Sequence, residues 1–372
     1  HHFKVIKKNL EFRLGANHLL TNLIAIKCFE TIYNKDDQKF DLFNELFVKA
    51  LKEQINNYGE HYELSPMYQS IILEQLIDLI IICKAYNKKV DKNLFEIVSK
   101  MFDCLCGVHH KNGQIAFFND TNNSSVSIQS LKKLYNSNFS QSIKTNITKN
   151  YESSNFKKRI FNKICFLIKI AGPGPKFNPG HSHADTLSFE ISFKNEKLFV
   201  NKGISSYNVN KLRLFQRSTR SHNCFEIDKK NSSKVWSSFR MARKARSFSK
   251  FIGKKKLILG HDGYSNFFFK RIVYRKVYFS SNKIKIIDSI DGKFNIARQY
   301  FHFYPGLKPI IKNNKLYIFK KKRTICVIES NVDNIKFKKG FFYEDFNKKE
   351  KNYTIVMSSK KSAIETDILF VK

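Results

Sequence analysis

The sequence predicts an α+β protein in which a helical part is followed by an antiparallel β-sandwich. Two observations support this: apolar residues recur at helical spacing over residues 1–135, and they alternate with polar residues in short runs beyond residue 160. Several strands without intervening helices favour stacked antiparallel sheets over a parallel sheet. A chain of 372 residues is long enough for two domains with a sizeable core.

Residues 1–135 are expected to form four or five helices arranged as antiparallel hairpins. Short polar turns at residues 34–37 and 56–59 separate the helical segments. The helices are marked by apolar side chains at helical spacing: Leu19, Leu20, Leu23, Ile24 and Ile26; Leu42, Phe43, Leu46, Phe47 and Leu51; Ile72, Leu73, Leu76, Ile77 and Ile80.

Residues 136–160 are rich in Ser, Asn and Lys and show no periodicity, so we expect a linker there. Residues 161–372 are expected to form the β-sandwich. Strand-like runs separated by Asn, Asp, Gly and Lys turns lie at residues 187–193, 272–279, 284–287, 315–319 and 353–357.

The chain is strongly basic, with 67 Lys and Arg against 31 Asp and Glu and a formal net charge of +36. Such a charge favours polyanionic partners: an acidic polysaccharide, nucleic acid or an anionic membrane surface. A compositional bias that spreads lysines over a solvated surface explains it equally well. No helix-turn-helix, zinc-finger or RNP-like pattern occurs, so no specific nucleic-acid partner is expected.

Other function classes are excluded by composition. A hydrophobic fraction of 42% with 36 Phe is too apolar for a disordered chain. The apolar run at Ile71–Cys83 carries Glu74 and Asp78, which favours a buried helix over a membrane span. The seven cysteines form no CxxC pair, so a zinc ribbon or thioredoxin-type motif is absent, and most are expected to be small buried hydrophobes.

The densest cluster of reactive side chains follows Gly180, where His181 and His183 stand two residues apart before a predicted strand. Two His at this spacing on a strand face the same side, so both could address one metal or one substrate. Downstream, Arg217, Arg220 and His222 precede another predicted strand. Arginine suits the recognition of carboxylate or sulfate groups. Taken by itself, however, this segment is explained as well by a solvated charged loop.

The helical part holds a second group of candidates. Asn17 and His18 open an apolar helix, and a loop with His61 and Glu63 precedes the next one. Ser65 followed by Pro66 fits a helix N-cap and first position, which places Tyr68 in the first turn. By position alone, such a tyrosine more often packs than reacts.

Together these segments resemble the heparinase II/III-like polysaccharide lyases, which include relatives acting on alginate. The resemblance runs from about residue 10 to beyond residue 305. The matching strings are ANHLLTNLIAI, HYELSPMYQSIILEQLIDL, FFND, NPGHSHADTLSFEISF, RSTRSHNCFEID, VWSSFR and FHFYPG.

The resemblance implies an (α/α) toroid followed by a β-sandwich, with the active site between them. A family toroid needs about twice the helices expected here, so the resemblance implies an N-terminally truncated member. The implied reaction is β-elimination on a uronic acid, in which a base removes the C5 proton, an acid protonates the leaving oxygen and the carboxylate is neutralised.

The resemblance also assigns roles to individual residues. Asn17 would neutralise the carboxylate with His18 beside it, while Tyr68 and His181 would act as base and acid. Nearby cations are expected to lower the pKa of Tyr68. Tyr207 matches a further tyrosine of the alginate-cleaving relatives. Four more side chains are expected to bind substrate: His61, Glu63, Arg217 and Arg220.

Relatives hold a structural zinc through His, Asp and His. His183 and His222 match the two histidines, but Asn201 stands where the Asp is expected. A neutral amide is a poor zinc ligand compared with a carboxylate, so zinc binding should be weakened or lost. Thr21 likewise stands where relatives often carry Glu. No other cofactor is implied.

The expected partner is therefore an anionic, uronate-containing polysaccharide resembling heparin, heparan sulfate or alginate. The alternative is a catalytically weak glycan-binding protein of surface-polysaccharide assembly or uptake. Because such glycans lie outside the cytoplasm, the resemblance implies a periplasmic or secreted location. The sequence leaves open whether the chain forms a homodimer, as some relatives do.

Overall fold

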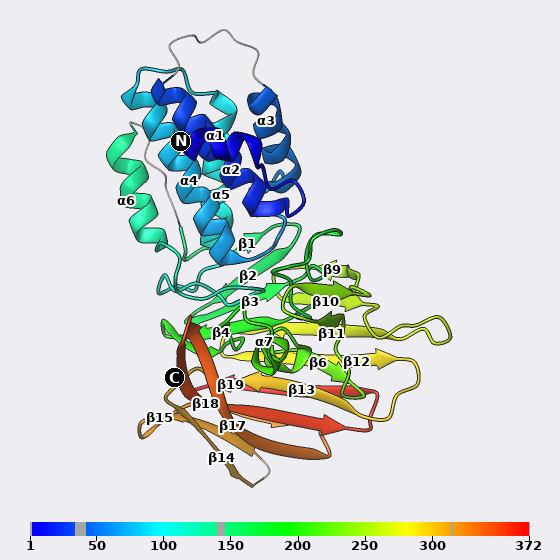
Figure 1. The fold of residues 1–372 in the computed structure, drawn as a ribbon. Helices are drawn as coiled ribbons and strands as arrows, with labels where there is room; N and C mark the ends of the chain where they lie inside the picture. Colours follow the sequence, from blue (N-terminus) through cyan, green and yellow to red (C-terminus); the bar gives the residue numbers. More distant parts are fainter. Residues whose placement is uncertain (1, 34–41, 140–145, 314, 372) are drawn as a thin grey trace.

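The computed structural model describes residues 2–33, 42–139, 146–313 and 315–371. The six N-terminal helices of the described residues, α1 to α6, occupy one side of the molecule and the antiparallel sheets the other, with the blue and cyan segments beside the first green strands (Figure 1). The predicted fold class is confirmed: a helical part precedes an antiparallel β-sandwich.

Six helices precede the first strand in the described residues, more than the four or five expected. They are α1 (His2–Lys8), α2 (Ala16–Tyr33), α3 (Leu42–Gln54), α4 (Pro66–Ala85), α5 (Lys92–Gly107) and α6 (Ile128–Asn138). Two short helices, α7 (Lys211–Gln216) and the 3₁₀ helix η1 (Thr219–Ser221), follow later, between strands. Helix α4 begins as predicted, because the Ser65 hydroxyl caps it by accepting from the Tyr68 N–H at 3.3 Å.

The strands run in four antiparallel sheets. They are β1 (Tyr151–Glu152), β2 (Phe156–Phe161), β3 (Ile164–Lys169), β4 (Phe189–Phe193), β5 (Glu196–Phe199), β6 (Phe225–Ile227), β7 (Lys234–Trp236), β8 (Arg240–Ala242), β9 (Ser247–Ile252), β10 (Lys256–His261), β11 (Ile272–Phe279), β12 (Lys283–Asp291), β13 (Ala297–His302), β14 (Leu307–Lys312), β15 (Lys315–Lys320), β16 (Arg323–Ser330), β17 (Asn334–Asp345), β18 (Lys348–Ser359) and β19 (Ala363–Phe370).

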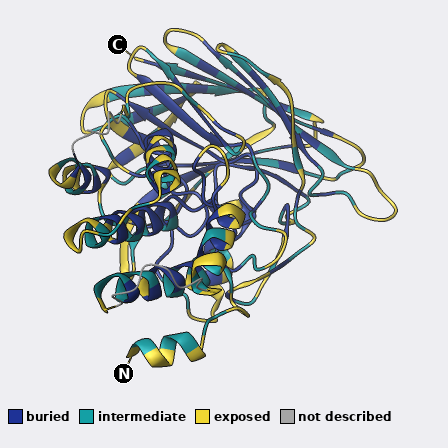
Figure 2. Ribbon diagram, turned by 90° about the horizontal axis from the view of Figure 1, so that it is seen from above, coloured by how far each residue is buried: buried dark blue, intermediate teal, exposed yellow. Residues whose placement is uncertain are grey.

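The sheet nearest the helices has the order β1-β2-β3-β4-β5. Strand β3 is buried on both faces because its side chains alternate between two cores. Cys165 and Leu167 pack into the helical core, whereas Phe166 and Ile168 pack into the sandwich core. This sheet is therefore the layer that joins the two halves, and buried residues run continuously from the helices into it (Figure 2).

The sandwich closes on an eight-stranded sheet of order β14-β15-β16-β19-β12-β11-β10-β9. Opposite it, the four-stranded sheet β17-β18-β13-β6 continues the five-stranded sheet, because Phe199 at the end of β5 bridges Phe303 just after β13. Ile286 of β12 and Phe301 of β13 belong to the same buried core between these layers.

The expected linker at 136–160 differs from the structure at both ends. Helix α6 extends to Asn138, and β1 and β2 already lie within the range. Residues 140–145 of this range lie outside the described residues. The sequence does not show the apolar–polar alternation of a strand in β2, because two of its buried residues are lysines. The Lys158 ammonium donates to three backbone carbonyls, including that of His109 at 2.6 Å.

One described helix, α4, is long and apolar enough to cross a membrane by length and composition. Its most apolar window has a mean hydropathy of 1.4, and 61% of that window is buried inside the fold. This is the environment of a core helix, in agreement with the sequence prediction. The seven cysteines are free thiols, and five of them are buried.

Candidate active site

Two tyrosines and a histidine meet where the helical part faces the sheets. The Tyr68 hydroxyl lies 3.1 Å from the Tyr207 hydroxyl, and the Tyr68 ring stacks on the His181 ring with centroids 4.0 Å apart. Tyr68 is in the first turn of α4, whereas His181 and Tyr207 come from loops before β4 and α7. We call Tyr68, His181 and Tyr207 the Tyr–His cluster.

Glu63 holds the histidine of this cluster. Its Oε1 lies 3.1 Å from His181 Nδ1, and a carboxylate only accepts, so Nδ1 carries a proton. The other ring nitrogen, Nε2, is then the lone-pair-bearing atom of the neutral ring. Burial alone would lower the pKa of His181, but the hydrogen bond and charge of Glu63 outweigh it and the pKa is raised. Glu63 is thus a positioning residue for His181.

The expected lowering of the Tyr68 pKa is wrong in this structure. Burial is the largest influence and raises the pKa, and the charges of Asp120 and Glu63 raise it further. The hydrogen bond from Tyr207 and the charge of Arg213 oppose this only in part. Burial likewise raises the pKa of Tyr207. Both phenols are therefore neutral proton donors at ordinary pH.

A buried ion pair between Asp120 and Arg213 packs against the Tyr207 ring of the cluster. Asp120 binds the Arg213 guanidinium through both carboxylate oxygens, with Oδ2 2.6 Å from Nη2. The Arg213 guanidinium lies over the Tyr207 ring, 5.0 Å from its centroid. The sequence patterns do not predict a functional role for Asp120 or Arg213. The only signal was that Asp120 ends the family-like string FFND.

Asn119, the residue before Asp120, ties the two halves together. Its side-chain amide donates to the backbone carbonyls of Glu63 at 2.8 Å and of Pro173 at 2.8 Å. Its carbonyl oxygen accepts from the Lys169 ammonium at 2.8 Å and from the His183 N–H at 3.0 Å. The loop that carries Glu63 is thereby held against the loop that carries His181.

The two histidines of the HxH motif do not share one target. His181 and His183 lie in the loop before β4, not on the strand, so the same-side argument does not apply. His181 faces Glu63 and Tyr68, whereas His183 donates from Nε2 to Asp120 Oδ1 at 2.6 Å and faces His222. Only His181 belongs to the Tyr–His cluster.

The start of α2 is brought near this site. The Asn178 side chain donates to the Leu14 carbonyl, just before Asn17. Of the described residues, none hydrogen-bonds the buried Oδ1 of Asn17. His18 points away, with its side chain 44% exposed and Nδ1 3.4 Å from the Glu11 carboxylate. In the described part of the chain no hydrogen bond joins Asn17 Oδ1 to the Tyr–His cluster, and the catalytic roles of Asn17 and His18 remain predictions.

Three of the four predicted substrate-binding residues lie outside the Tyr–His cluster: Arg217, Arg220 and His61. Arg217 is buried, and its guanidinium donates to five backbone carbonyls, among them that of Ser182 at 3.0 Å, so it braces loops. Arg220 lines a separate cavity on the sandwich. His61 is buried, bonded to Gln54 at 3.2 Å, and burial lowers its pKa to about 4, so it is a neutral core residue.

The histidine pair implied for zinc offers only two ligands. Asp120 accepts from Nε2 of His183, and the Ser218 carbonyl accepts from Nδ1 of His222 at 2.8 Å. The two remaining ring nitrogens, Nδ1 of His183 and Nε2 of His222, lie 3.0 Å apart in contact with each other. Zinc in a structural site takes four donors.

The third implied ligand is already engaged. Asn201 is buried, with Oδ1 accepting from the Asn223 N–H at 3.0 Å and Nδ2 3.4 Å from the Ser188 hydroxyl. Across the described residues, no group of three His, Cys, Asp or Glu side chains could hold a metal. The residues present do not fit a structural zinc.

We therefore expect the purified protein to contain well under one zinc per chain, and a chelator to leave its Tm unchanged. Elemental analysis and a thermal melt with and without chelator measure this. A stoichiometric zinc, with a Tm that falls on chelation, would contradict the interpretation.

A family model described as heparinase II/III-like, C-terminal, matches residues 146–370, more than half of the chain. The chain belongs to the heparinase II/III-like family. No curated protein is significantly similar in sequence.

Solved structures of related fold extend the likeness over the helical part. A heparinase III described as the BT4657 gene product has a TM-score of 0.77 at 16% identity, covering 100% of this chain and 62% of its own. The heparan sulfate lyase HepC from Pedobacter heparinus gives 0.71 at 14%, covering 99% and 61%. A chondroitin AC lyase from Streptomyces coelicolor A3 gives 0.52 at 6%, covering 94% and 60%.

At these identities the likeness shows a shared fold. This heparinase II/III-like chain spans about three fifths of the length of those structures. The Tyr–His cluster of this chain joins Tyr68 of helix α4 to loop residues that lie between β3 and β4 and before α7.

Proposed function

We propose that the protein is a polysaccharide lyase that cleaves an anionic, uronate-containing glycan by β-elimination. The observation that carries the proposal is the convergence of Tyr68, His181 and Tyr207, in which a neutral phenol stacks on a carboxylate-oriented imidazole. An acid and a base at one place are what β-elimination needs. The family and the fold of heparinases support the substrate class.

In the proposed reaction, the neutral His181 ring takes the C5 proton of the uronate at Nε2, because Nδ1 is committed to Glu63. The C5–H electron pair forms the C4–C5 double bond, and the bond from C4 to the glycosidic oxygen breaks. Tyr68 donates its hydroxyl proton to that oxygen. Asn17 would hydrogen-bond the uronate carboxylate and stabilise the charge that develops on it.

In this assignment, Tyr68 starts the reaction protonated and His181 starts it neutral, able to accept a proton. The raised pKa of Tyr68 keeps the phenol protonated until the leaving oxygen needs a proton. The raised pKa of His181 makes its neutral form a stronger base than an ordinary imidazole. We place the activity outside the cytoplasm, in the periplasm or secreted, because such glycans lie there.

The test is the ultraviolet absorbance of the unsaturated uronate product. The protein is incubated with heparan sulfate, heparin, hyaluronan, chondroitin and alginate in turn. A rise with one glycan supports the proposal and identifies the substrate. No rise with any of them would overturn it.

Replacing Glu63 by Gln is expected to shift the pH dependence of turnover. The base must be neutral, so kcat/KM rises as pH passes the pKa of His181, which Glu63 holds above the ordinary value of about 6.5. Gln keeps a hydrogen-bond acceptor but removes the charge, and burial then lowers this pKa. The rising limb should move to lower pH in a pH–rate profile.

Glu96→Gln is the matched control, because Glu96 is exposed and pairs with Lys100 on helix α5, not with the Tyr–His cluster. Its profile should overlay that of the unsubstituted protein. An unshifted rising limb in Glu63→Gln would show that His181 is not the base.

A further inference from the structure

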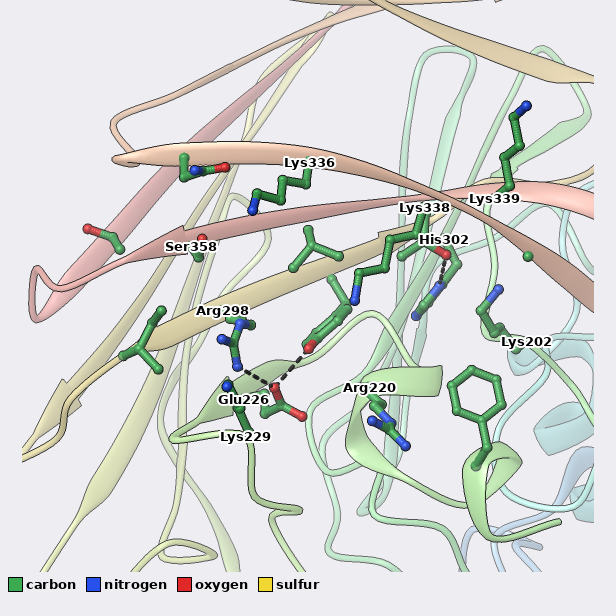
Figure 3. A pocket seen from close by; sticks show the side chains of 18 of the residues that line it. Lys202, Arg220, Glu226, Lys229, Arg298, His302, Lys336, Lys338, Lys339 and Ser358 are labelled. Atoms are coloured by element: carbon green, nitrogen blue, oxygen red, sulfur yellow. Dashed lines mark hydrogen bonds and ion pairs between the residues drawn. The ribbon is translucent and has the colours of Figure 1, made fainter. Parts of the chain in front are cut away.

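A cavity of about 940 Å³ lies on the sandwich, and none of the Tyr–His cluster residues lines it. Its volume lies in the range of small-molecule sites, about 300–1,000 Å³. The four-stranded sheet β17-β18-β13-β6 forms its floor, and Phe215 and Arg220 contribute from the α7–η1 segment. Figure 3 shows its lining side chains.

The register of the sheet explains why the floor is polar. Ile335 and Phe337 of β17 pack toward the sandwich core, so the alternate residues Lys336 and Lys338 face the cavity. Across the ladder, Lys338 pairs with Thr354 of β18. The same alternation continues through β13, where three cavity-facing residues are paired in order with β18: Arg298, Tyr300 and His302.

The cavity is strongly cationic. Eight of its lining side chains are Lys or Arg, and two are Asp or Glu. Glu226 is already engaged, accepting from the Tyr300 hydroxyl at 2.8 Å and pairing with Arg298 at 3.4 Å. Among the described residues, seven of these eight cations form no ion pair: Lys202, Arg220, Lys229, Lys336, Lys338, Lys339 and Lys360.

One cation is buried at the cavity wall without a carboxylate. The Lys202 ammonium is held by neutral groups, the Phe341 carbonyl at 3.0 Å and the Asn352 side chain at 3.1 Å. Burial lowers its pKa to about 7. A buried ammonium without a counter-charge is costly, and an anionic ligand nearby would stabilise its charged form.

We propose that this cavity is a second binding site, distinct from the Tyr–His cluster, for an anionic saccharide that carries carboxylate or sulfate groups. The inference rests on the proposed function for its ligand class, because a chain acting on polyanionic glycans gains from holding them outside the reactive cleft. Hydroxyl groups of Tyr300, Thr354 and Ser358 lie among the cations and suit a hydroxylated ligand.

A saccharide fits this site better than a nucleic acid. Duplex grooves are read by a protruding helix or β-ribbon, whereas this site is a hollow. Single strands are held by aromatic side chains on which successive bases stack. Here Tyr300 and Tyr343 are buried, and the half-buried rings of Phe215 and Phe341 are covered by the cations of Arg220 and Lys349.

The test uses the full chain carrying Tyr68→Phe, so that the probe is not consumed. A heparin hexasaccharide is titrated by calorimetry into this protein and into two further variants. The first removes three cavity charges, Lys336→Gln with Lys338→Gln and Lys339→Gln. The matched control removes three exposed charges from the other sheet, Lys308→Gln with Lys312→Gln and Lys322→Gln.

We expect the cavity variant to bind the hexasaccharide at least about tenfold more weakly, because charge-assisted hydrogen bonds are lost. The control should change affinity by less than about threefold, since its lysines lie outside the cavity and act on the ligand only through a screened field. All six lysines are exposed, so both variants should fold normally, which a thermal melt verifies.

Equal weakening in both variants, or no binding at all, would overturn the proposed site. So would an RNA hexanucleotide that binds as tightly as the saccharide and is weakened equally by the cavity substitutions. The proposed binding site and the proposed lyase activity can be tested separately. Selective loss of binding in the cavity variant, with no product from any glycan in the unsubstituted protein, would keep the site and remove the enzyme.

Discussion

Replacing Tyr68 by Phe should lower kcat on the cleaved glycan by about 10²–10⁴-fold, the usual contribution of a general acid. The substitution removes one hydroxyl and leaves the aromatic ring stacked on His181 at 4.0 Å. Substrate affinity should therefore change little. Product absorbance gives kcat, and calorimetry with an uncleaved oligosaccharide gives the affinity.

Tyr58→Phe is the control, because Tyr58 is 52% exposed and lies outside the Tyr–His cluster. It should keep full activity. Tyr207→Phe removes the hydroxyl 3.1 Å from that of Tyr68 and should cost less than Tyr68→Phe, since it removes a partner of the proposed acid. Unchanged turnover in Tyr68→Phe would remove the role assigned to this residue.

Replacing Asp120 by Asn should lower the free energy of unfolding by about 3–5 kcal/mol, as expected when one partner of a buried ion pair is removed. Asp120 and Arg213 are both fully buried, and the guanidinium would keep its charge without a carboxylate. His183 would also lose its charged acceptor. Urea denaturation measures the change.

Asp262→Asn provides the comparison. Asp262 pairs with Arg246, whose side chain is 89% exposed, so its loss should cost at most about 1 kcal/mol. A similar small effect in Asp120→Asn would contradict the account of the buried pair.

The stability supplied by Asp120 should also depend on pH. Burial alone would raise its pKa, but Arg213 and His183 outweigh burial and lower it. A carboxyl with a lowered pKa stabilises the fold above its unfolded value, about 3.9, and loses this contribution as pH falls below that value. The difference in stability between the protein and Asp120→Asn should shrink accordingly in acid.

Local signals predicted much of the architecture. The Ser65–Pro66 cap and the apolar spacing after it placed Tyr68 in the first turn of a helix, because capping and periodicity depend on neighbours a few residues away. Strand alternation over 272–279 and 353–357 likewise falls within β11 and β18. The buried lysines of β2 broke that alternation and hid the strand from the pattern.

The site was predictable only through the family-like strings. The strings contain Tyr68 and His181, and the resemblance to the alginate-cleaving relatives added Tyr207. The structure brings these three together across separations of up to 139 residues. They did not show that Glu63 orients His181 or that Arg213 pairs with Asp120, 93 residues away. The spacing of His181 and His183 suggested a shared target, and the loop conformation separates them.

The order of helices and strands, the basic charge and the residues able to transfer protons can all be read from the amino-acid sequence, because each depends on composition or short-range pattern. Three further properties depend on folding: which of those residues meet, which arginine donates all its hydrogen bonds to backbone carbonyls, and whether the pKa of a tyrosine rises or falls. Burial and partners distant in the sequence control hydrogen bonding and ionisation, so the tertiary structure decides them.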